Sequence, residues 1–331
     1  GLGFFLFRRG RTEAEPGSVQ TDPTSSRAML LLKESLALLE PLENQSALAY
    51  AHLCLGVAGY TMGDFQEAQD TLLRGLAISR DVRDKWLTAV HLGHLGMIAY
   101  STGQYVEAEQ RLADSVVLWR EVGDVRGLVF NLSIYGMVSA ALGEFDLAQQ
   151  LLDESLHISG QNNDRWGVAN AFNYLGQIAL EREPADLEAA HYFLTESATI
   201  FKELGARWML VCVLNNLGQI AAARQNNGQA KQVFLEALDM AVTDPILPAA
   251  MESLAGLADL LMREGEMCRA AEVIAQVLNH PASSQHAKDK AKQLRVALEA
   301  RVSPDQLDSS GASASCQSLQ MITARLHNGQ V

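Results

Sequence analysis

The sequence predicts an all-α protein in which antiparallel helix pairs stack into an α-α superhelix. A Leu-Gly pair or a close variant recurs along the chain, and its second residue stands at positions 56, 96, 136, 176, 218 and 258. The intervals are 40, 40, 40, 42 and 40 residues, and a fixed period of this size is typical of stacked-repeat proteins. The composition, 48% hydrophobic and 6% aromatic with 8 prolines, favours helices over strands.

Two helices and a glycine corner make up each predicted repeat. In the first complete repeat one helix ends at Gly63, which suits the left-handed conformation that closes a helix, and the next begins with Asp64 as its cap. The first helices of later repeats follow aspartates that stand 40 residues apart and are expected to be N-caps: Asp84, Asp124 and Asp164.

The repeated glycine lies in the middle of each first helix, where glycine costs about 1 kcal/mol relative to alanine. Close approach of the second helix is the simplest reason to keep it, and an alanine twelve residues later, Ala68 after Gly56, is expected at the same contact. Tryptophans near the starts of first helices are interpreted as packing residues between repeats: Trp86, Trp166 and Trp208.

The same period sets the expected domain organisation. Residues 1–302 form one array, with a truncated first repeat, an inserted loop at about 11–27, six further repeats and a capping helix over 284–301. Residues 303–331 are expected to be a flexible tail in which Leu319, Ile322 and Leu326 have the spacing of a short helix. Because the first repeat lacks its beginning, the chain is expected to be part of a longer protein.

Charge and composition restrict the possible partners. The net charge is −13 and the Lys and Arg residues are scattered, so the basic stripe of a nucleic-acid-binding protein is missing. No apolar run approaches the 18 residues of a membrane span. The four cysteines form no CxxC pair and are expected to be reduced thiols in a cytoplasmic protein.

The sequence contains no recognisable catalytic or cofactor motif. His91 and His94 lie three residues apart, but no third metal ligand has motif spacing. GxSxG, HExxH and a glycine-rich phosphate loop with Lys-Ser or Lys-Thr are all missing. The chain is therefore predicted to be no enzyme and to hold no metal and no cofactor.

The pattern within each repeat resembles the tetratricopeptide repeat (TPR): Leu-Gly, a glycine seven residues on, an aromatic residue two further and an alanine three further. The period of 40 rather than 34 is similar to that in the C-terminal sensor regions of bacterial STAND ATPases and MalT-like regulators. Recurrent serines of the second helices add to the likeness: Ser35, Ser115, Ser155 and Ser197. The resemblance implies a right-handed superhelix with first helices on its concave wall, and a nucleotide-binding domain before the array as a further partner.

Helical spacing relative to the repeated glycine then predicts which side chains of the first helices face the concave groove. The N-terminal part of this wall is apolar and aromatic, and its middle is rich in amides, which can pair with the backbone of an extended peptide. Solvation of these amides, or pairing between repeats, is the alternative. The candidate partner-binding residues are Tyr60, Tyr100, Phe130, Asn170, Asn173, Gln177, Asn215, Asn216 and Gln219.

These observations together predict a non-enzymatic protein- or peptide-binding module. It would serve as the sensor or scaffold array of a larger bacterial signalling or regulatory protein, with its partner in the concave groove. The alternative is a sensor domain for a small-molecule effector, in which Tyr60, Tyr100 and Phe130 supply an apolar wall.

Overall fold

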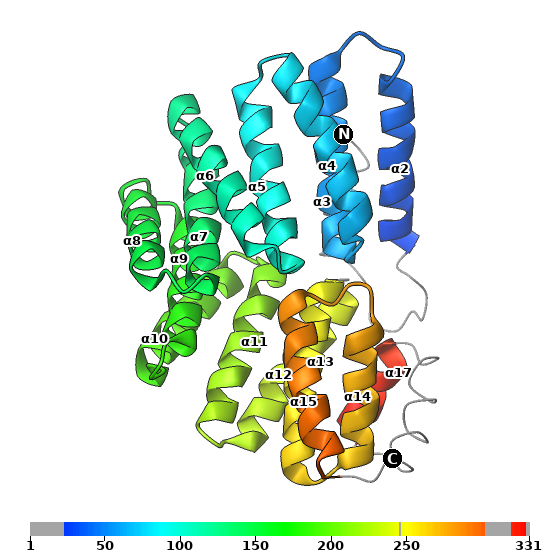
Figure 1. Cartoon of the computed structure of the whole chain (residues 1–331), viewed down its shortest axis with the longest axis vertical. Coiled ribbons are helices and arrows are strands. Elements are labelled where there is room, and N and C mark those ends of the chain that lie inside the picture. The colour runs from blue at the N-terminus through cyan, green and yellow to red at the C-terminus, as the bar shows by residue number, and fades with distance from the viewer. Residues whose placement is uncertain (1–22, 245, 302–318, 329–331) are drawn as a thin grey trace. The chain divides into compact units, whose positions relative to one another are not determined.

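The computed structural model describes residues 23–244, 246–301 and 319–328, which form fifteen α-helices and no strand (Figure 1). The chain divides into two compact units, Gly1–Gly205 and Ala206–Val331. None of the described helices is long and apolar enough to cross a membrane.

Unit 1 consists of helix pairs in which each helix packs against the next along the chain. Its helices are α2 (Pro23–Leu39), α3 (Gln45–Met62), α4 (Phe65–Asp81), α5 (Lys85–Ser101), α6 (Tyr105–Val122), α7 (Val125–Ala141), α8 (Phe145–Gln161), α9 (Arg165–Glu181) and α10 (Leu187–Glu203). The odd-numbered helices from α3 to α9 are the first helices of their repeats. The inserted loop was expected to reach residue 27, but α2 already begins at Pro23, because proline is tolerated in the first turn of a helix.

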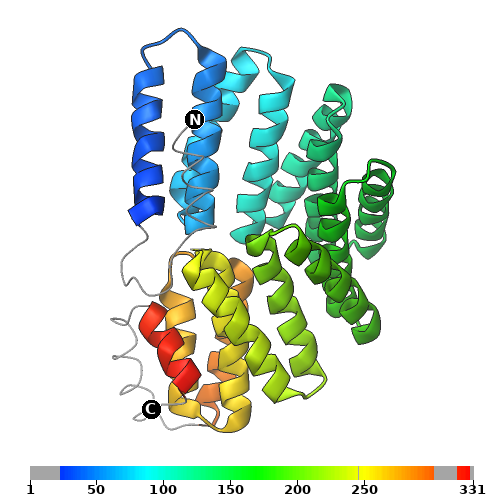
Figure 2. The ribbon, with the colours of Figure 1, turned by 180° about the vertical axis from the view of Figure 1, so that it is seen from behind.

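Unit 2 continues the same pattern and contains one further helix from the expected tail (Figure 2). Its helices are α11 (Arg207–Ala223), α12 (Asn227–Thr243), α13 (Leu247–Glu264), α14 (Met267–Asn279), α15 (Gln285–Glu299) and α17 (Leu319–Asn328). The expectation of a flexible tail is wrong for α17, because Ile322 and Leu326 are buried in the apolar core of the unit. Residues 1–22 and 302–318, on which other expectations fall, lie outside the described part.

The helix ends follow the sequence signals with one exception. The carboxylates of Asp84, Asp124 and Asp164 each accept a hydrogen bond from the backbone N–H three residues on, at 3.0, 3.1 and 3.2 Å. Gly63 has the left-handed conformation, with φ of 80°. Asp64, by contrast, makes no side-chain cap bond, so the prediction of a second cap at this corner is wrong.

The repeated glycines mark the closest approach of the two helices within each repeat. A Cβ atom on Gly56 would lie 2.5 Å from Cγ of Leu72 and 3.3 Å from the carbonyl oxygen of Ala68, so any larger residue would push the helices apart. The expected contact with the alanine is confirmed, although a side chain of the second helix lies closer still. The same contact joins Gly96 to Leu112, Gly136 to Leu152, Gly176 to Leu194 and Gly218 to Phe234.

The recurrent serines of the second helices bind the first helices of their own repeats. The hydroxyls of Ser115, Ser155 and Ser197 donate to backbone carbonyls at 2.8, 3.2 and 2.7 Å. Each accepting residue stands seven positions before the repeated glycine: Ala89, Val129 and Ala169. Because serine and carbonyl are both buried, these bonds fix how far one helix slides along the other.

The first complete repeat replaces this serine with a glycine and a histidine ring. Gly75 stands 40 residues before Ser115, and His91 stands 40 residues before Asn131, whose Oδ1 accepts a 3.0 Å bond from Ser115. A Cβ on Gly75 would lie 2.2 Å from Nε2 of His91. The ring of His91 therefore fills the volume that a serine occupies in the next repeat.

One repeat pairs Gly75 with His91 where the next pairs Ser115 with Asn131, and this exchange predicts the effect of restoring the serine. We expect Gly75→Ser to lower the free energy of unfolding by about 1–3 kcal/mol, because the added atoms overlap the buried ring of His91. Adding His91→Asn reproduces the pairing of Ser115 with Asn131 and should recover at least half of the loss. Urea unfolding followed by circular dichroism measures both free energies of unfolding. A double variant less stable than Gly75→Ser would contradict the equivalence of the two residue pairs.

His91 also predicts a pH dependence of stability. Burial lowers the pKa of His91 to about 4, although its bond to the Leu87 carbonyl opposes the shift. Between pH 6.5 and 4 the unfolded state therefore binds more protons at His91 than the folded state does. The contribution of neutral His91 to the free energy of unfolding is complete above pH 6.5 and falls by roughly 3 kcal/mol as the pH drops to 4.

The comparison with His91→Asn isolates this residue. Burial lowers the pKa of His52, His94 and His280 in the same direction, so the wild-type slope contains their contributions as well. We expect the free energy of unfolding of His91→Asn to change less steeply between pH 7.5 and 4.5. Parallel pH profiles of the two proteins would show that His91 is not the titrating group.

Candidate functional site

A row of ring side chains crosses three consecutive first helices of unit 1. The ring centroids of His94 on α5 and Phe130 on α7 are 6.4 Å apart, and those of Phe130 and Trp166 on α9 are 5.7 Å apart. All three side chains are partly exposed. Of these, sequence reasoning identified only Phe130 as a site residue, but a spacing of 36 residues, four less than the repeat, relates each ring to the next and is a signal for the row.

The face that carries this row is almost free of charge. Among the Asp, Glu, Lys and Arg residues, α3 contains none, and α5, α7, α9 and α11 contain them only within two residues of a helix end. Burial lowers the pKa of His94, so its ring is neutral near pH 7. We call this surface of unit 1 the first-helix face; its partly exposed residues are Val57, Tyr60, Val90, His94, Met97, Tyr100, Phe130, Met137, Trp166 and Gln177.

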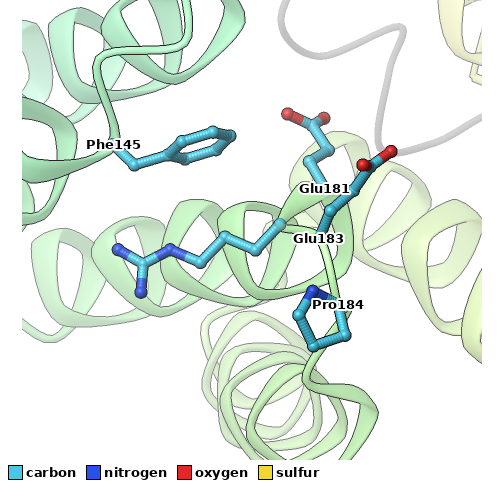
Figure 3. A pocket seen from close by; sticks show the side chains of 5 residues that line it. Phe145, Glu181, Glu183 and Pro184 are labelled. Atoms are coloured by element: carbon cyan, nitrogen blue, oxygen red, sulfur yellow. The ribbon is translucent and has the colours of Figure 1, made fainter.

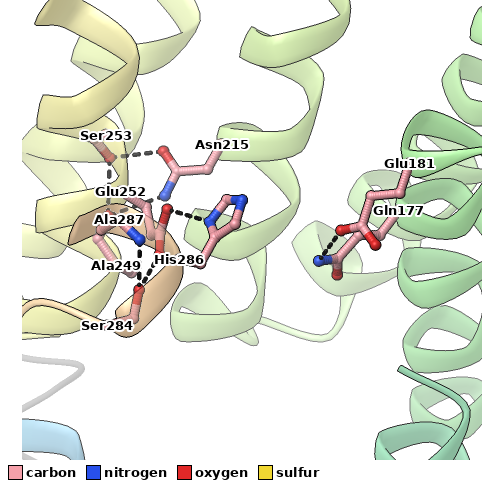
Figure 4. A network of polar contacts seen from close by, with 9 residues as sticks. All are labelled: Gln177, Glu181, Asn215, Ala249, Glu252, Ser253, Ser284, His286 and Ala287. Atoms are coloured by element: carbon pink, nitrogen blue, oxygen red, sulfur yellow. Dashed lines mark hydrogen bonds and ion pairs between the residues drawn. The ribbon is translucent and has the colours of Figure 1, made fainter. Parts of the chain in front are cut away.

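The predicted site residues of unit 1 that are partly exposed also contact their neighbours. The hydroxyl of Tyr60 lies 3.2 Å from Oγ of Ser101 on the next first helix. The ring centroid of Tyr100 is 5.6 Å from that of Tyr105. The amide of Gln177 donates to Glu181 at 3.0 Å, one turn along α9 (Figure 4). Polar and aromatic atoms therefore alternate on this face.

The expected exposure of three asparagines is wrong. Asn170, Asn173 and Asn215 are only 0%, 3% and 4% exposed, so the amides do not form an open ladder. The reason is their position, since Asn173 and Asn215 stand three residues before the repeated glycine. Leu53 and Ser133 have that position in other repeats and are buried as well, which shows that it points into the packed interior.

Asn215 illustrates what a buried amide does at this position. Its Nδ2 donates to the carbonyl oxygen of Ala249 at 3.0 Å, and Oγ of Ser253 donates to its Oδ1 at 2.7 Å (Figure 4). Asn215 thus joins α11 to the next first helix, α13. For this residue the alternative expected from the sequence, pairing between repeats, is the one observed. Asn216 and Gln219 remain partly exposed on α11.

Asn170 differs from the other two asparagines. It is completely buried, and neither its oxygen nor its nitrogen has a hydrogen-bond partner among the described residues. An unpaired buried amide costs about 1–3 kcal/mol, which makes this position unusual within the chain.

A Ser-His-Glu group in unit 2 has the residue types of a hydrolase but not the required order. Oε2 of Glu252 lies 2.9 Å from Nδ1 of His286, and the hydroxyl of Ser284 donates to the other oxygen of the same carboxylate (Figure 4). Burial opposes ionisation of Glu252, but His286 and Ser284 together outweigh it and lower its pKa. Because the carboxylate lies between serine and histidine, the imidazole does not contact the hydroxyl as it does in a catalytic triad, and the group joins α13 to α15.

An open cleft lies at a corner of unit 1, and none of the predicted site residues lines it. The cleft, of about 560 Å³, is lined by Phe145, Glu181, Arg182, Glu183 and Pro184 (Figure 3). The guanidinium of Arg182 lies 5.7 Å from the centroid of the Phe145 ring. The lining contains no nucleophile and no histidine, so it offers carboxylates and a stacked cation but no arrangement for catalysis.

Metal binding finds no support in the described residues. No group of three or more His, Cys, Asp or Glu side chains there is arranged to hold a metal ion. The nearby histidines His91 and His94 each bind a backbone carbonyl of their own helix through Nδ1, at 2.7 and 3.0 Å.

Comparison with known proteins places the chain among TPR-like helical repeat proteins. Residues 88–122, which span most of α5 and α6, match a family model of the tetratricopeptide repeat. No curated protein matches the sequence significantly.

Two similar solved structures with TM-scores above 0.5 share the fold at low sequence identity. A Rap protein complexed with competence and sporulation factor is 14% identical with a TM-score of 0.60, over 98% of this chain and 87% of that one. NprR in complex with its cognate peptide NprX is 12% identical with a TM-score of 0.57, over 99% and 92%. A STAND protein with a TPR sensor from Pyrococcus horikoshii is 14% identical with a TM-score of 0.49, over 88% and 42%.

The two amide environments of α11 predict different effects of truncation. We expect Asn215→Ala to lower the free energy of unfolding by about 1–3 kcal/mol, because it removes two buried hydrogen bonds, from Asn215 to the Ala249 carbonyl and from the Ser253 hydroxyl to Asn215. Gln219→Ala, at a partly exposed position of the same helix, should change it by less than about 0.5 kcal/mol. Chemical unfolding measures both, and equal losses would contradict the structural role of Asn215.

Proposed function

We propose that the chain is a protein- or peptide-binding module, the sensor or scaffold array of a larger bacterial regulatory protein. The partner lies against the first-helix face, in the groove expected of TPR-like arrays. The module acts without catalysing a reaction, and an N-terminal nucleotide-binding domain of the same protein is the expected recipient of the signal.

The observation that carries the proposal is the chemistry of the first-helix face. Half-exposed rings and methionines gather on it, while the charged residues of α5, α7 and α9 stand only near the ends of these helices. Interfaces are enriched in aromatic residues and methionine and depleted of charge at their centres. The row His94, Phe130 and Trp166 gives this face a continuous rigid platform across three repeats.

The fold adds independent support. Two of the similar structures are complexes, one with competence and sporulation factor and one with the cognate peptide NprX. Both cover nearly all of this chain with TM-scores above 0.5. The net charge of −13 argues against nucleic acid as the partner.

A selection of binding peptides tests the proposal. A phage-displayed library of random twelve-residue peptides, panned on the purified chain, should yield peptides rich in apolar residues with micromolar affinity. Met137→Glu places a charge on the first-helix face and should weaken the selected peptides at least tenfold in fluorescence anisotropy. Affinity should change less than about twofold between 50 and 500 mM NaCl, because the face carries almost no charge.

Val117→Glu is the matched control. Val117 is 55% exposed on the second helix α6, so the same charge added there should leave affinity unchanged. Peptides that bind both variants equally, or that are strongly basic and lose affinity in salt, would contradict the proposed face. If the chain is instead a sensor for a small molecule, no peptide is selected and a metabolite raises the melting temperature of the wild-type protein. The same metabolite should not raise the melting temperature of Met137→Glu.

A further inference from the structure

The last helix, α17, is docked on the second helices of unit 2. It lies against α12 and α14 (Figures 1 and 2). Leu319, Ile322 and Leu326, spaced at i, i+3 and i+7, form its apolar stripe and join the core cluster of the unit. Ile322 and Leu326 are 7% and 5% exposed, so the stripe is buried against the unit.

Three charged side chains of α12 and α14 contact the C-terminal half of α17. Oε2 of Glu272 lies 3.1 Å from Nη1 of Arg325. Oδ1 of Asp239 lies 2.8 Å from Nε2 of His327. Two acidic side chains thus face the two basic side chains of α17, which contains no acidic residue.

The third charged side chain binds the end of the helix itself. Nη2 of Arg269 donates to the backbone carbonyl of Arg325 at 3.2 Å. Since α17 ends at Asn328, this carbonyl is one of the last four, which have no N–H partner within a helix. Arg269 is only 8% exposed, and its charge also complements the negative end of the helix dipole. The contact therefore requires a helix terminus and not a particular side chain.

Among the described second helices, only this pair has all three of these residues. Ala237 of α12 aligns with the recurrent serines Ser115, Ser155 and Ser197 of unit 1. Asp239 stands two residues after it, and the equivalent residues of α6, α8 and α10 are Val117, His157 and Thr199. Val277 is the residue of α14 that aligns with the recurrent serines. Arg269 stands eight residues before it, and the equivalent residues of α6, α8, α10 and α12 are Glu107, Leu147, Ala189 and Gln229. Glu272 stands five before it, where the earlier repeats have Asp70, Gln110, Gln150, Tyr192 and Gln232. The repeat pattern alone does not require any of the three.

The helical conformation of α17 depends on its docking. Ten residues are fewer than an isolated helix needs to be stable in water, so α17 is helical because it is bound. The side chains of His327 and Asp239 are 41% and 48% exposed, and such ion pairs contribute little. The covalent connection compensates by giving α17 a high effective concentration at the surface. A helix from another protein that makes stronger contacts with α12 and α14 would therefore compete with α17 for this surface.

We propose that α12 and α14 form a docking site for a short amphipathic helix of a partner protein, and that α17 is the resident occupant which the partner displaces. The partner helix has an apolar stripe at i, i+3 and i+7, basic side chains in its last turns for Asp239 and Glu272, and a free C-terminal end over Arg269. The site is separate from the first-helix face and does not depend on the function proposed for that face.

A peptide added to the full chain tests the site. Ile322→Asp combined with Leu326→Asp removes the apolar stripe of α17 and leaves the surface of α12 and α14 unchanged. A fluorescein-labelled peptide with the sequence of residues 318–331 should bind this variant at least tenfold more tightly than wild type, whose site is occupied. Fluorescence anisotropy measures the affinities, and circular dichroism shows that the variant is folded.

Two further substitutions in that variant test the recognition. Glu272→Gln introduces the residue that α6, α8 and α12 have at this position and should weaken the peptide at least fivefold. Glu196→Gln, at an exposed carboxylate of α10, is the matched control and should leave the affinity unchanged. Equal affinity for wild type and the double variant, or no binding to a folded double variant, would overturn the proposal.

If the double variant does not fold, amide hydrogen exchange of the wild-type protein tests the proposal instead. Excess unlabelled peptide should speed amide exchange in α17 and not in α12 or α14, and unchanged exchange in α17 would overturn displacement. A wild-type dimer that forms with rising concentration and is lost in Glu272→Gln would identify a second copy as the partner and support the site.

Discussion

The close approach of two helices at each repeated glycine is the constraint on which the rest of the structure depends. Leu72 lies where a Cβ of Gly56 would be, and later repeats make the same contact. Five such glycines each cost about 1 kcal/mol of helix propensity, and the burial of a leucine or phenylalanine against each offsets that cost. Because the contact fixes the rotation and the slide of one helix on the other, the serine hydroxyls of α6, α8 and α10 reach carbonyls at one constant position.

The fixed rotation also decides which positions join consecutive first helices. Phe130 stands six residues before the repeated glycine of its helix and contacts Trp166, two residues after the cap Asp164. Glu252 stands six residues before Ala258, and it contacts His286, two residues after the cap Ser284. An aromatic pair in unit 1 and a charged pair in unit 2 therefore occupy equivalent places. One packing geometry accepts either chemistry, provided that both partners change together.

Much of the fold, but less of the candidate site, could be predicted from the sequence. The period, the aspartate caps and the close contact at Gly56 are local or strictly repeated, so one sequence contains them several times. The exposure of Asn170 and Asn173 depends instead on how tightly neighbouring helices pack, and spacing within one helix cannot give that angle. The docking of α17 depends on contacts 56 and 88 residues away in sequence, from Arg269 to Arg325 and from Asp239 to His327, which no repeat pattern contains.

The two proposed surfaces differ in the physical term that would select their partners. Burial of apolar area, worth roughly 25 cal/mol per Å², drives binding at the first-helix face and is insensitive to salt. At α12 and α14 the apolar stripe supplies similar energy, but Asp239, Arg269 and Glu272 determine which helix is accepted and in which direction it lies. Charge at the second surface thus adds specificity to the affinity that the apolar stripe supplies. If both proposals hold, the low charge of the first helices of unit 1 and the charged side chains of α12 and α14 would let one repeat architecture recognise a neutral partner and a basic one by different means.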